Sequence, residues 1–171
     1  MAIRKIREMG DPVLYKRSKE VTDITPRIRD LIDDMFETLY EAEGVGLAAP
    51  QVGILKRIVV IDTTGEDPIL LINPKLMETS GEQEGYEGCL SVPGVYGYVK
   101  RPEHVKVRAQ DRNGKWFEVE GFGLTARAMC HELAHLEGQL FTEVSEHIMS
   151  DEELDDYYGR DVSSEIHGRE R

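Results

Sequence analysis

The chain has 171 residues, the length of one ordinary domain, and its 40% hydrophobic and 32% charged content is typical of a globular protein with a packed core. It holds no long apolar run, so we expect no membrane-spanning helix and no membrane partner. The formal net charge of −12 argues against direct nucleic-acid binding, because phosphate backbones bind basic surfaces.

The start of the chain and its cysteines predict a cytoplasmic protein. Residues 1–8 include basic side chains but not the apolar segment of a secretion signal. In a reducing cytosol we expect no disulfide between Cys89 and Cys130. We interpret Cys130 as a core residue.

The first predicted element is a helix over about residues 26–43. Thr25 is a typical N-cap, Pro26 suits the first helical position, and Gly44 is expected to end the helix. Apolar residues follow at helical spacing and predict a core-facing stripe: Ile28, Leu31, Ile32, Met35 and Leu39.

Strands and a second helix are expected further along the chain. Residues 57–62 and 69–73 are apolar runs typical of buried strands, the second ended by Pro74. Residues 105–110 and 116–120 alternate around a turn at Asp111, which predicts a hairpin. A helix is expected from about 124 to 137, ending near Gly138. Together these elements predict a single-domain α+β fold whose mostly antiparallel sheets pack around a central helix.

The last part of the chain differs in composition from the rest. Residues 151–171 hold eight acidic and three basic side chains. We expect residues 1–150 to form the catalytic domain and 151–171 to form an acidic C-terminal extension. A short helix is predicted over 151–158, and disorder over 159–171.

The pattern His131-Glu132-Leu133-Ala134-His135 lies on the second predicted helix. Residues four apart share one helix face, so the two imidazoles can hold one metal ion, with Glu132 as general base. A catalytic site of this kind needs a third protein ligand, and Cys89, beside Gly88, is the candidate. Cysteine and histidine ligands by themselves favour zinc.

Three segments together resemble the signature motifs of the peptide deformylase family, in the same order. They are GVGLAAPQVG at residues 44–53, EGCLSVP at 87–93 and HELAHLEG at 131–138. The resemblance covers roughly residues 3–145. It implies hydrolysis of the N-formyl group from the formyl-methionine of new polypeptides, with release of formate. It further implies a bacterial cytoplasmic enzyme with one divalent metal ion, natively Fe²⁺, with Zn²⁺, Ni²⁺ or Co²⁺ able to replace it, and with the ribosome as a candidate partner.

The same resemblance implies a role for individual residues. Cys89, His131 and His135 would bind the metal. Glu132 would take a proton from water and later protonate the leaving amine. The Gln51 side chain and the Leu90 backbone N–H would face the developing oxyanion.

The resemblance also implies a substrate-binding set. The segment Gly44, Val45 and Gly46 would bind the peptide backbone in an extended, strand-like way. Leu124 and Ala128 are expected to line an apolar pocket for the methionine side chain.

One position departs from the family pattern, which usually reads His-Glu-x-Asp-His. This chain has Ala134 in place of the aspartate. We hypothesise that the lost carboxylate would have paired with a basic residue such as Arg101. Outer partners of this kind change metal affinity or activity by roughly 10–100-fold.

Two alternatives remain open from the sequence. A zinc endopeptidase shares the two-histidine pattern but usually takes its third ligand downstream, and Glu143 and Glu146 lack the expected spacing. A metal-stabilised module that captures N-terminal peptides without turnover is the other, and Ala134 is the feature that favours it.

Overall fold

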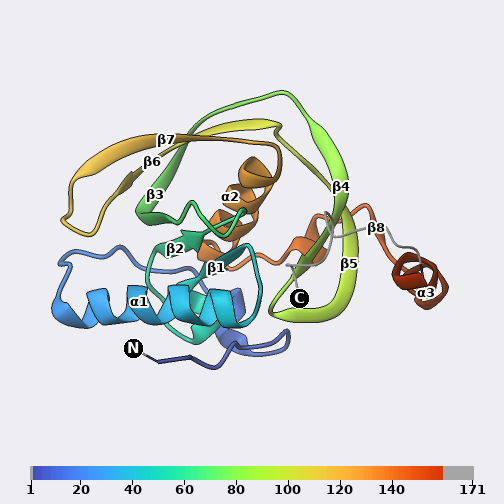
Figure 1. Ribbon diagram of the computed structural model, residues 1–171, viewed down its shortest axis with the longest axis horizontal. Helices are drawn as coiled ribbons and strands as arrows, with labels where there is room; N and C mark the ends of the chain where they lie inside the picture. Colours follow the sequence, from blue (N-terminus) through green and yellow to red (C-terminus); the bar gives the residue numbers. More distant parts are fainter. Residues whose placement is uncertain (1, 160–171) are drawn as a thin grey trace.

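The computed structural model describes residues 2–159, which form an α+β fold with two antiparallel sheets (Figure 1). The larger sheet has the order β1-β2-β3-β6-β7, built from Gly46–Ala48, Ile58–Ile61, Ile69–Ser80, His104–Gln110 and Trp116–Phe122. The smaller sheet has the order β4-β5-β8, built from Gln83–Cys89, Val92–Arg101 and His147–Ile148. Three α-helices accompany them: α1 (Pro26–Glu41), α2 (Gly123–Leu136) and α3 (Asp151–Gly159). Figure 1 shows α2 near the centre, so the predicted α+β arrangement around a central helix is confirmed.

The larger sheet is packed on both faces, and β2 shows why. Its four residues alternate between two apolar clusters. Val59 and Ile61 pack with Met129 of α2, whereas Ile58 and Val60 belong to the cluster that contains the apolar stripe of α1. Each fully buried aliphatic side chain contributes roughly 1.5–3 kcal/mol. The burial of both faces of β2 therefore holds α1 and α2 on opposite sides of the sheet.

Helix α1 begins where the sequence predicts and ends slightly earlier. The Thr25 side chain accepts a hydrogen bond from the Ile28 backbone N–H, which confirms the N-cap. The helix ends at Glu41, not at 43, and Glu43 rather than Gly44 takes the left-handed conformation, with φ of 56°. The Gly44 N–H then bonds to the Leu39 carbonyl at 3.1 Å, which closes the helix end.

The predicted strands lie where the sequence indicated, but one of them is longer than predicted and further strands were missed. The hairpin of β6 and β7 is confirmed. The expectation that Pro74 ends a strand was wrong, because β3 continues to Ser80. Its register with β6 breaks between Ile72 and Lys75, so Pro74 lies at an irregularity that tolerates the missing N–H. Strands β4 and β5 had not been predicted.

Two further predictions concern the ends of helices. Helix α2 confirms the predicted second helix, and Gly138 follows its cap with φ of 78°. Helix α3 confirms the predicted helix over 151–158, and its Tyr157 packs on Tyr96 of β5 at 5.7 Å between ring centroids. The disorder predicted for the end of the chain concerns residues 160–171, which lie outside the described residues. Within residues 2–159, no helix combines the length and apolar character needed to cross a membrane.

Replacement of Gly138 by alanine is expected to destabilise the end of α2. A Cβ at Gly138 would lie 2.6 Å from the Tyr15 carbonyl oxygen, in addition to the unfavourable positive φ. The positive φ alone costs roughly 1–2 kcal/mol. We expect Gly138→Ala to lower the free energy of unfolding by more than that amount in urea denaturation.

Gly94→Ala is the matched control, because Gly94 has the same φ of 78° and an added Cβ would meet no atom within 4 Å. Gly94→Ala should lower the free energy of unfolding only by the cost of the positive φ. Equal losses in the two variants would contradict the role of the Tyr15 contact.

Candidate metal centre and active site

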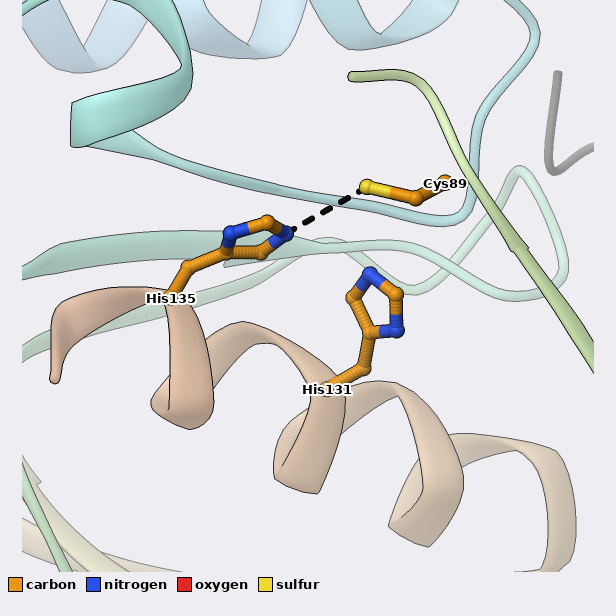
Figure 2. Close-up of side chains that lie close together, drawn as sticks. All are labelled: Cys89, His131 and His135. Carbon is orange, nitrogen blue, oxygen red and sulfur yellow. Dashed lines mark hydrogen bonds between the residues drawn. The ribbon is translucent and has the colours of Figure 1, made fainter. Parts of the chain in front are cut away.

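Two histidines of α2 and one cysteine of β4 meet in the interior. Cys89, His131 and His135 are all buried, and each offers one ligand atom within 4.8 Å of the others. Figure 2 shows both imidazole rings projecting from the same side of α2 toward the sulfur. The Cys89 Sγ lies 3.4 Å from His135 Nε2. A thiolate and two imidazoles are a donor set suited to a transition metal, so these residues fit the predicted ion.

The position of Cys89 follows from the turn between β4 and β5. Cys89 pairs with Val92, so Leu90 and Ser91 form a tight two-residue connection. The Ser91 backbone N–H donates to Cys89 Sγ at 3.4 Å. The turn thereby fixes the sulfur above α2 and places the backbone of Leu90 directly beside it.

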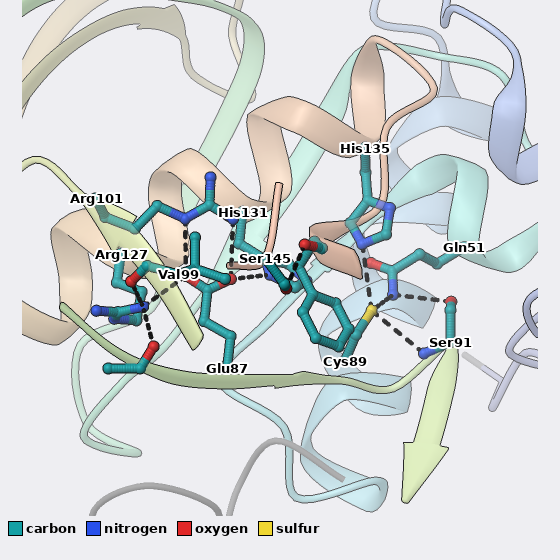
Figure 3. Close-up of polar contacts among 12 residues, drawn as sticks. Gln51, Glu87, Cys89, Ser91, Val99, Arg101, Arg127, His131, His135 and Ser145 are labelled. Carbon is teal, nitrogen blue, oxygen red and sulfur yellow. Dashed lines mark hydrogen bonds and ion pairs between the residues drawn. The ribbon is translucent and has the colours of Figure 1, made fainter. Parts of the chain in front are cut away.

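Glu87 connects this hairpin to the metal helix. Its Oε1 accepts a hydrogen bond from His131 Nδ1 at 2.9 Å. Arg101 donates to both carboxylate oxygens, at 2.7 and 2.9 Å, and Arg127 Nη1 donates to Oε2 at 2.8 Å (Figure 3). With Nδ1 of His131 engaged by a carboxylate, its Nε2 is the nitrogen left to bind a metal.

The buried charges shift the pKa values of the site in different directions. Burial would raise the pKa of Glu87, but hydrogen bonds from Arg101 and His131 hold it far below its ordinary value. Burial would likewise lower the pKa of His131, but the neighbouring Cys89 and Glu87 raise it well above its ordinary value. Burial, together with the charge of His131, lowers the pKa of His135. Cysteine and histidine bind a metal in their deprotonated forms, so metal affinity should rise with pH.

Glu132 follows His131 on α2 and lies beside the cluster of Cys89, His131 and His135. It is only 3% exposed, and its Oε1 has no hydrogen-bond partner among residues 2–159. Burial raises its pKa to about 7. A Cβ at Gly46 would lie 2.6 Å from Glu132 Oε2, so only a glycine at position 46 allows β1 to approach this closely.

Gln51 is held by a buried network in the short 3₁₀ helix η2 (Ala49–Val52). Its Oε1 accepts from the Ala48 N–H at 2.9 Å, and its Nε2 donates to Ser91 Oγ at 3.0 Å and toward Cys89 Sγ at 3.6 Å. Figure 3 shows the amide directed at the sulfur. The network fixes the amide so that its donor group faces the metal ligands.

The predicted substrate-binding residues differ in how close they lie to this centre. Gly44 packs closely on Leu90, since a Cβ at Gly44 would lie 2.7 Å from Leu90 Cδ1. Strand β1, which starts at Gly46, is an edge strand of the larger sheet. Val45 and Ala128 line a small cavity with Glu132, whereas Leu124 is 40% exposed and does not line it.

The hypothesis that a carboxylate at position 134 would pair with Arg101 stays a prediction. Arg101 is already bound through two hydrogen bonds to Glu87 on the metal side of α2. Ala134 instead lines an outer hollow with Arg57, Lys75 and half-buried Cys130. Cys130 packs against the core, as predicted.

The endopeptidase alternative finds no support in the geometry. The carboxylate of Glu143 accepts a hydrogen bond from the Leu140 N–H at 2.9 Å, and Glu146 forms an ion pair with Lys100 at 3.8 Å. Neither belongs to the metal-ligand cluster found in residues 2–159, whose third member is Cys89.

Sequence reasoning missed three residues of the site, although local spacing pointed to each. Glu87 precedes Cys89 by two positions on β4, and both side chains reach the histidines of α2 although the register with β5 shifts between them. Arg127 precedes His131 by one helical turn, so both can reach Glu87. Ser91 follows Cys89 across the turn, where its hydroxyl meets Gln51.

Comparison with known proteins decides the family. The model of the polypeptide deformylase family matches residues 3–150. The chain belongs to the peptide deformylase family. A peptide deformylase of Lachnoclostridium phytofermentans is 61% identical over 84% of this chain and 89% of its own length. That of Agathobacter rectalis is 58% identical over 91% of this chain and 98% of its own length.

Solved structures show the same fold. A peptide deformylase from Legionella pneumophila matches with a TM-score of 0.81 and 43% identity, covering 91% of this chain and 95% of that one. The enzyme from Thermotoga maritima matches with a TM-score of 0.81 and 40% identity, over 85% and 99% of the two chains. Peptide deformylases are metal-dependent hydrolases that remove the N-formyl group from nascent peptides, and this activity is that of the chain.

Loss of the Glu87 charge is expected to weaken the metal site. Glu87→Gln keeps the side-chain shape but leaves Arg101 and Arg127 without their anionic partner and loosens His131. We expect metal affinity to fall by roughly 10–100-fold in a chelator competition assay.

Glu137→Gln is the control. Glu137 lies at the end of α2 and also pairs with an arginine, Arg57, but it is about half exposed and does not contact Cys89, His131 or His135. Its metal affinity should stay at the wild-type value. An unchanged affinity in Glu87→Gln would refute the positioning role of Glu87.

Replacement of Gly46 by alanine is expected to displace the Glu132 carboxylate, because the new Cβ would overlap Oε2. We expect kcat to fall by about 100-fold or more, the scale of lost general acid–base catalysis, with metal content unchanged. Gly159→Ala, where no atom lies within 4 Å, should retain full activity. Wild-type kcat in Gly46→Ala would show that the close contact is not required.

Proposed function

We propose that Cys89, His131 and His135 hold one divalent metal ion, natively Fe²⁺, with Zn²⁺, Ni²⁺ or Co²⁺ as replacements. The burial of all three residues and the spacing of their ligand atoms, within 4.8 Å of one another, support this assignment. Neutral imidazole and thiolate ligands suit each of these ions. The hydrogen bond from His131 to Glu87 supports a fixed orientation of that ligand.

Glu132 is the general base and then the general acid of this proposal. When bound, the divalent ion acts as a Lewis acid and lowers the pKa of water. Glu132 removes a proton from the water that attacks the formyl carbon and returns it to the departing amine nitrogen. Its unpartnered Oε1 and its pKa of about 7 in the absence of metal support both steps, because a carboxyl near neutrality can accept and release a proton.

Gln51 and the Leu90 N–H stabilise the oxyanion in this proposal. The bond from Gln51 Nε2 to Cys89 Sγ is long, at 3.6 Å, so this donor can turn toward a substrate oxygen while Ser91 still holds the amide. The position of Leu90 in the turn next to Cys89 supports a second donor from the backbone. Such donors are worth roughly 3–4 kcal/mol each in acyl transfer.

The peptide substrate is proposed to run along the edge of β1. Gly44, Val45 and Gly46 precede or begin this strand, and the edge position of β1 supports strand-like binding. Val45 and Ala128 are proposed to contact the methionine side chain, because both line the cavity beside Glu132. Leu124 is the weaker member of the predicted set, since it lies outside that lining.

The cellular setting is also a proposal. Residues 1–150 would form the catalytic domain and 151–171 an acidic extension, in line with a family match over 3–150. Bacterial relatives and a nascent-chain substrate support a place in the bacterial cytoplasm, with the ribosome as the site where substrates emerge. The overall charge of −12 argues against direct nucleic-acid binding.

The unpartnered, buried Glu132 carboxylate beside the ligand cluster is the observation that carries the proposed mechanism. The test is formate release from a formyl-methionyl peptide by protein loaded with Fe²⁺ without oxygen. We expect rapid turnover by the wild type and a loss of about 100-fold or more in Glu132→Gln with its metal retained. Because only the deprotonated base accepts a proton, the wild-type rate should fall as pH decreases, and positive charge from the metal should move this limb below pH 7.

Two results would contradict the assignment. Stoichiometric metal without turnover by the wild type would favour peptide binding without hydrolysis. Near-wild-type turnover by Glu132→Gln would require a different base. A Cys89→Ala variant that keeps its metal with wild-type affinity would remove the thiolate from the proposed ligand set.

A further inference from the structure

The N-terminal segment of residues 2–11, which we call the strap, contains no helix or strand. Figure 1 shows it in dark blue, passing below α1. It is bound to that helix at its beginning. The Ala2 N–H donates to Asp34 Oδ1 at 2.6 Å, and the Arg4 N–H donates to Thr38 Oγ1 at 2.9 Å. From there the strap continues to the active site.

The strap bonds to two residues of the proposed oxyanion site. The Arg7 N–H donates to the Gln51 carbonyl at 2.7 Å, and the Met9 N–H donates to the Ser91 carbonyl at 2.8 Å. Gln51 and Ser91 are also joined directly, because Gln51 Nε2 donates to Ser91 Oγ at 3.0 Å (Figure 3). The short helix η2 and the β4–β5 turn are therefore joined twice, by side chains in the site and by the backbone of the strap.

The Arg7 side chain makes a further contact with η2. A Cβ at Gly53 would lie 2.7 Å from Arg7 Nη2, so the guanidinium lies directly against the glycine that ends η2 with φ of 86°. Arg7 Nη1 also donates to Asp11 Oδ2 at 3.0 Å. Both partners of this ion pair are more than a quarter exposed, so the pair adds little to stability. Its effect is to hold the guanidinium over Gly53.

The distance between η2 and the turn matters because each supplies one of the proposed donors. Gln51 belongs to η2, whereas the Leu90 N–H belongs to the turn. Both donors must point to one oxygen, and a displacement of about 1 Å can cost roughly 100-fold in rate. In the proposed mechanism Gln51 Nε2 turns from Cys89 toward the substrate. The strap carries no reacting group, so it can fix the distance while the amide turns.

We propose that the strap fixes Gln51 relative to the β4–β5 turn, with Arg7 and Met9 as positioning residues. This inference rests on the oxyanion role proposed for Gln51. The bond from Arg7 holds η2, the bond from Met9 holds the turn, and the single residue between them sets the spacing. Loss of either bond lets the two donors separate. Stabilisation of the transition state then falls, while metal and peptide still bind.

Proline substitution tests each bond, because proline lacks the N–H that donates. In Arg7→Pro and in Met9→Pro, kcat for formate release should fall by about 10-fold or more, with KM and metal content close to wild type. This split between kcat and KM is expected for an interaction made in the transition state. Thermal unfolding of each variant checks the fold, and Met9→Pro carries the test if Arg7→Pro folds poorly.

Arg4→Pro is the matched control. It removes a strap N–H that bonds to α1 rather than to the site, together with the ion pair to Asp34. It should destabilise the protein at least as much as Arg7→Pro and leave kcat unchanged. An equal fall in kcat in Arg4→Pro would overturn the proposal. Wild-type kcat in both Arg7→Pro and Met9→Pro, with a slow Gln51→Ala, would do the same.

A double-mutant cycle tests whether the strap acts through Gln51. In a Gln51→Ala background, Arg7→Pro should lower kcat by less than about 2-fold, because the donor that the strap positions is already absent. A loss that stays near 10-fold in that background would show that the strap acts on another group.

Nuclear magnetic resonance separates this inference from the proposed mechanism. In protein loaded with Zn²⁺, the signals of the Gln51 side-chain amide should shift or broaden in Arg7→Pro and Met9→Pro but not in Arg4→Pro. Unchanged signals in all three variants would refute the role of the strap, whatever the kinetics of Gln51→Ala. Shifted signals together with wild-type kcat in Gln51→Ala would support the strap and refute the oxyanion role of Gln51.

Discussion

The carboxylate of Glu87 is the interaction on which the active site depends. It is 3% exposed, yet it accepts hydrogen bonds from His131, Arg101 and Arg127, which come from two different elements. Burying a carboxylate without partners costs several kcal/mol, so α2 and the β4–β5 hairpin are stable together only in the arrangement that satisfies it. That arrangement also brings Cys89, two positions along β4, to the histidines. The ion-pair network thus assembles the ligand set.

Apolar periodicity predicted the parts of the fold in which one face is buried in a core. Helix α1, β2 and the β6–β7 hairpin were predicted for this reason, because the apolar side chains of each recur at regular spacing and pack in an apolar cluster. It failed for β4 and β5, because the inward residue is the charged Glu87 and glycines interrupt both strands. It failed again after Pro74, where the remaining residues of β3 are exposed and leave no apolar pattern. Tertiary contacts, which sequence spacing does not contain, decide these strands.

The sequence predicted that Cys89, His131 and His135 would lie together, and the structure brings them together. His131 and His135 share a face by helical geometry, and Cys89 was found through the family motif together with the need for a third ligand. The residues that orient them were missed, because spacing along the chain does not show which of the neighbouring polar side chains turn toward the site. The pairing of a carboxylate at position 134 with Arg101 stays a prediction, because Ala134 lines an outer hollow with Arg57 and Lys75 while Arg101 binds Glu87.

The two histidines are not equivalent, and the difference has a physical consequence. His131 Nδ1 is bound to Glu87, whereas His135 Nδ1 is buried without a hydrogen-bond partner among the described residues. An unsatisfied buried polar group costs roughly 1–3 kcal/mol, so His135 is held by packing and by its Nε2 contact with Cys89. Burial and the charge of His131 lower the pKa of His135, whereas Cys89 and Glu87 raise the pKa of His131 despite its burial. Glu87 therefore orients one of the two imidazoles by a hydrogen bond, and the same carboxylate joins the β4–β5 hairpin to α2 through Arg101.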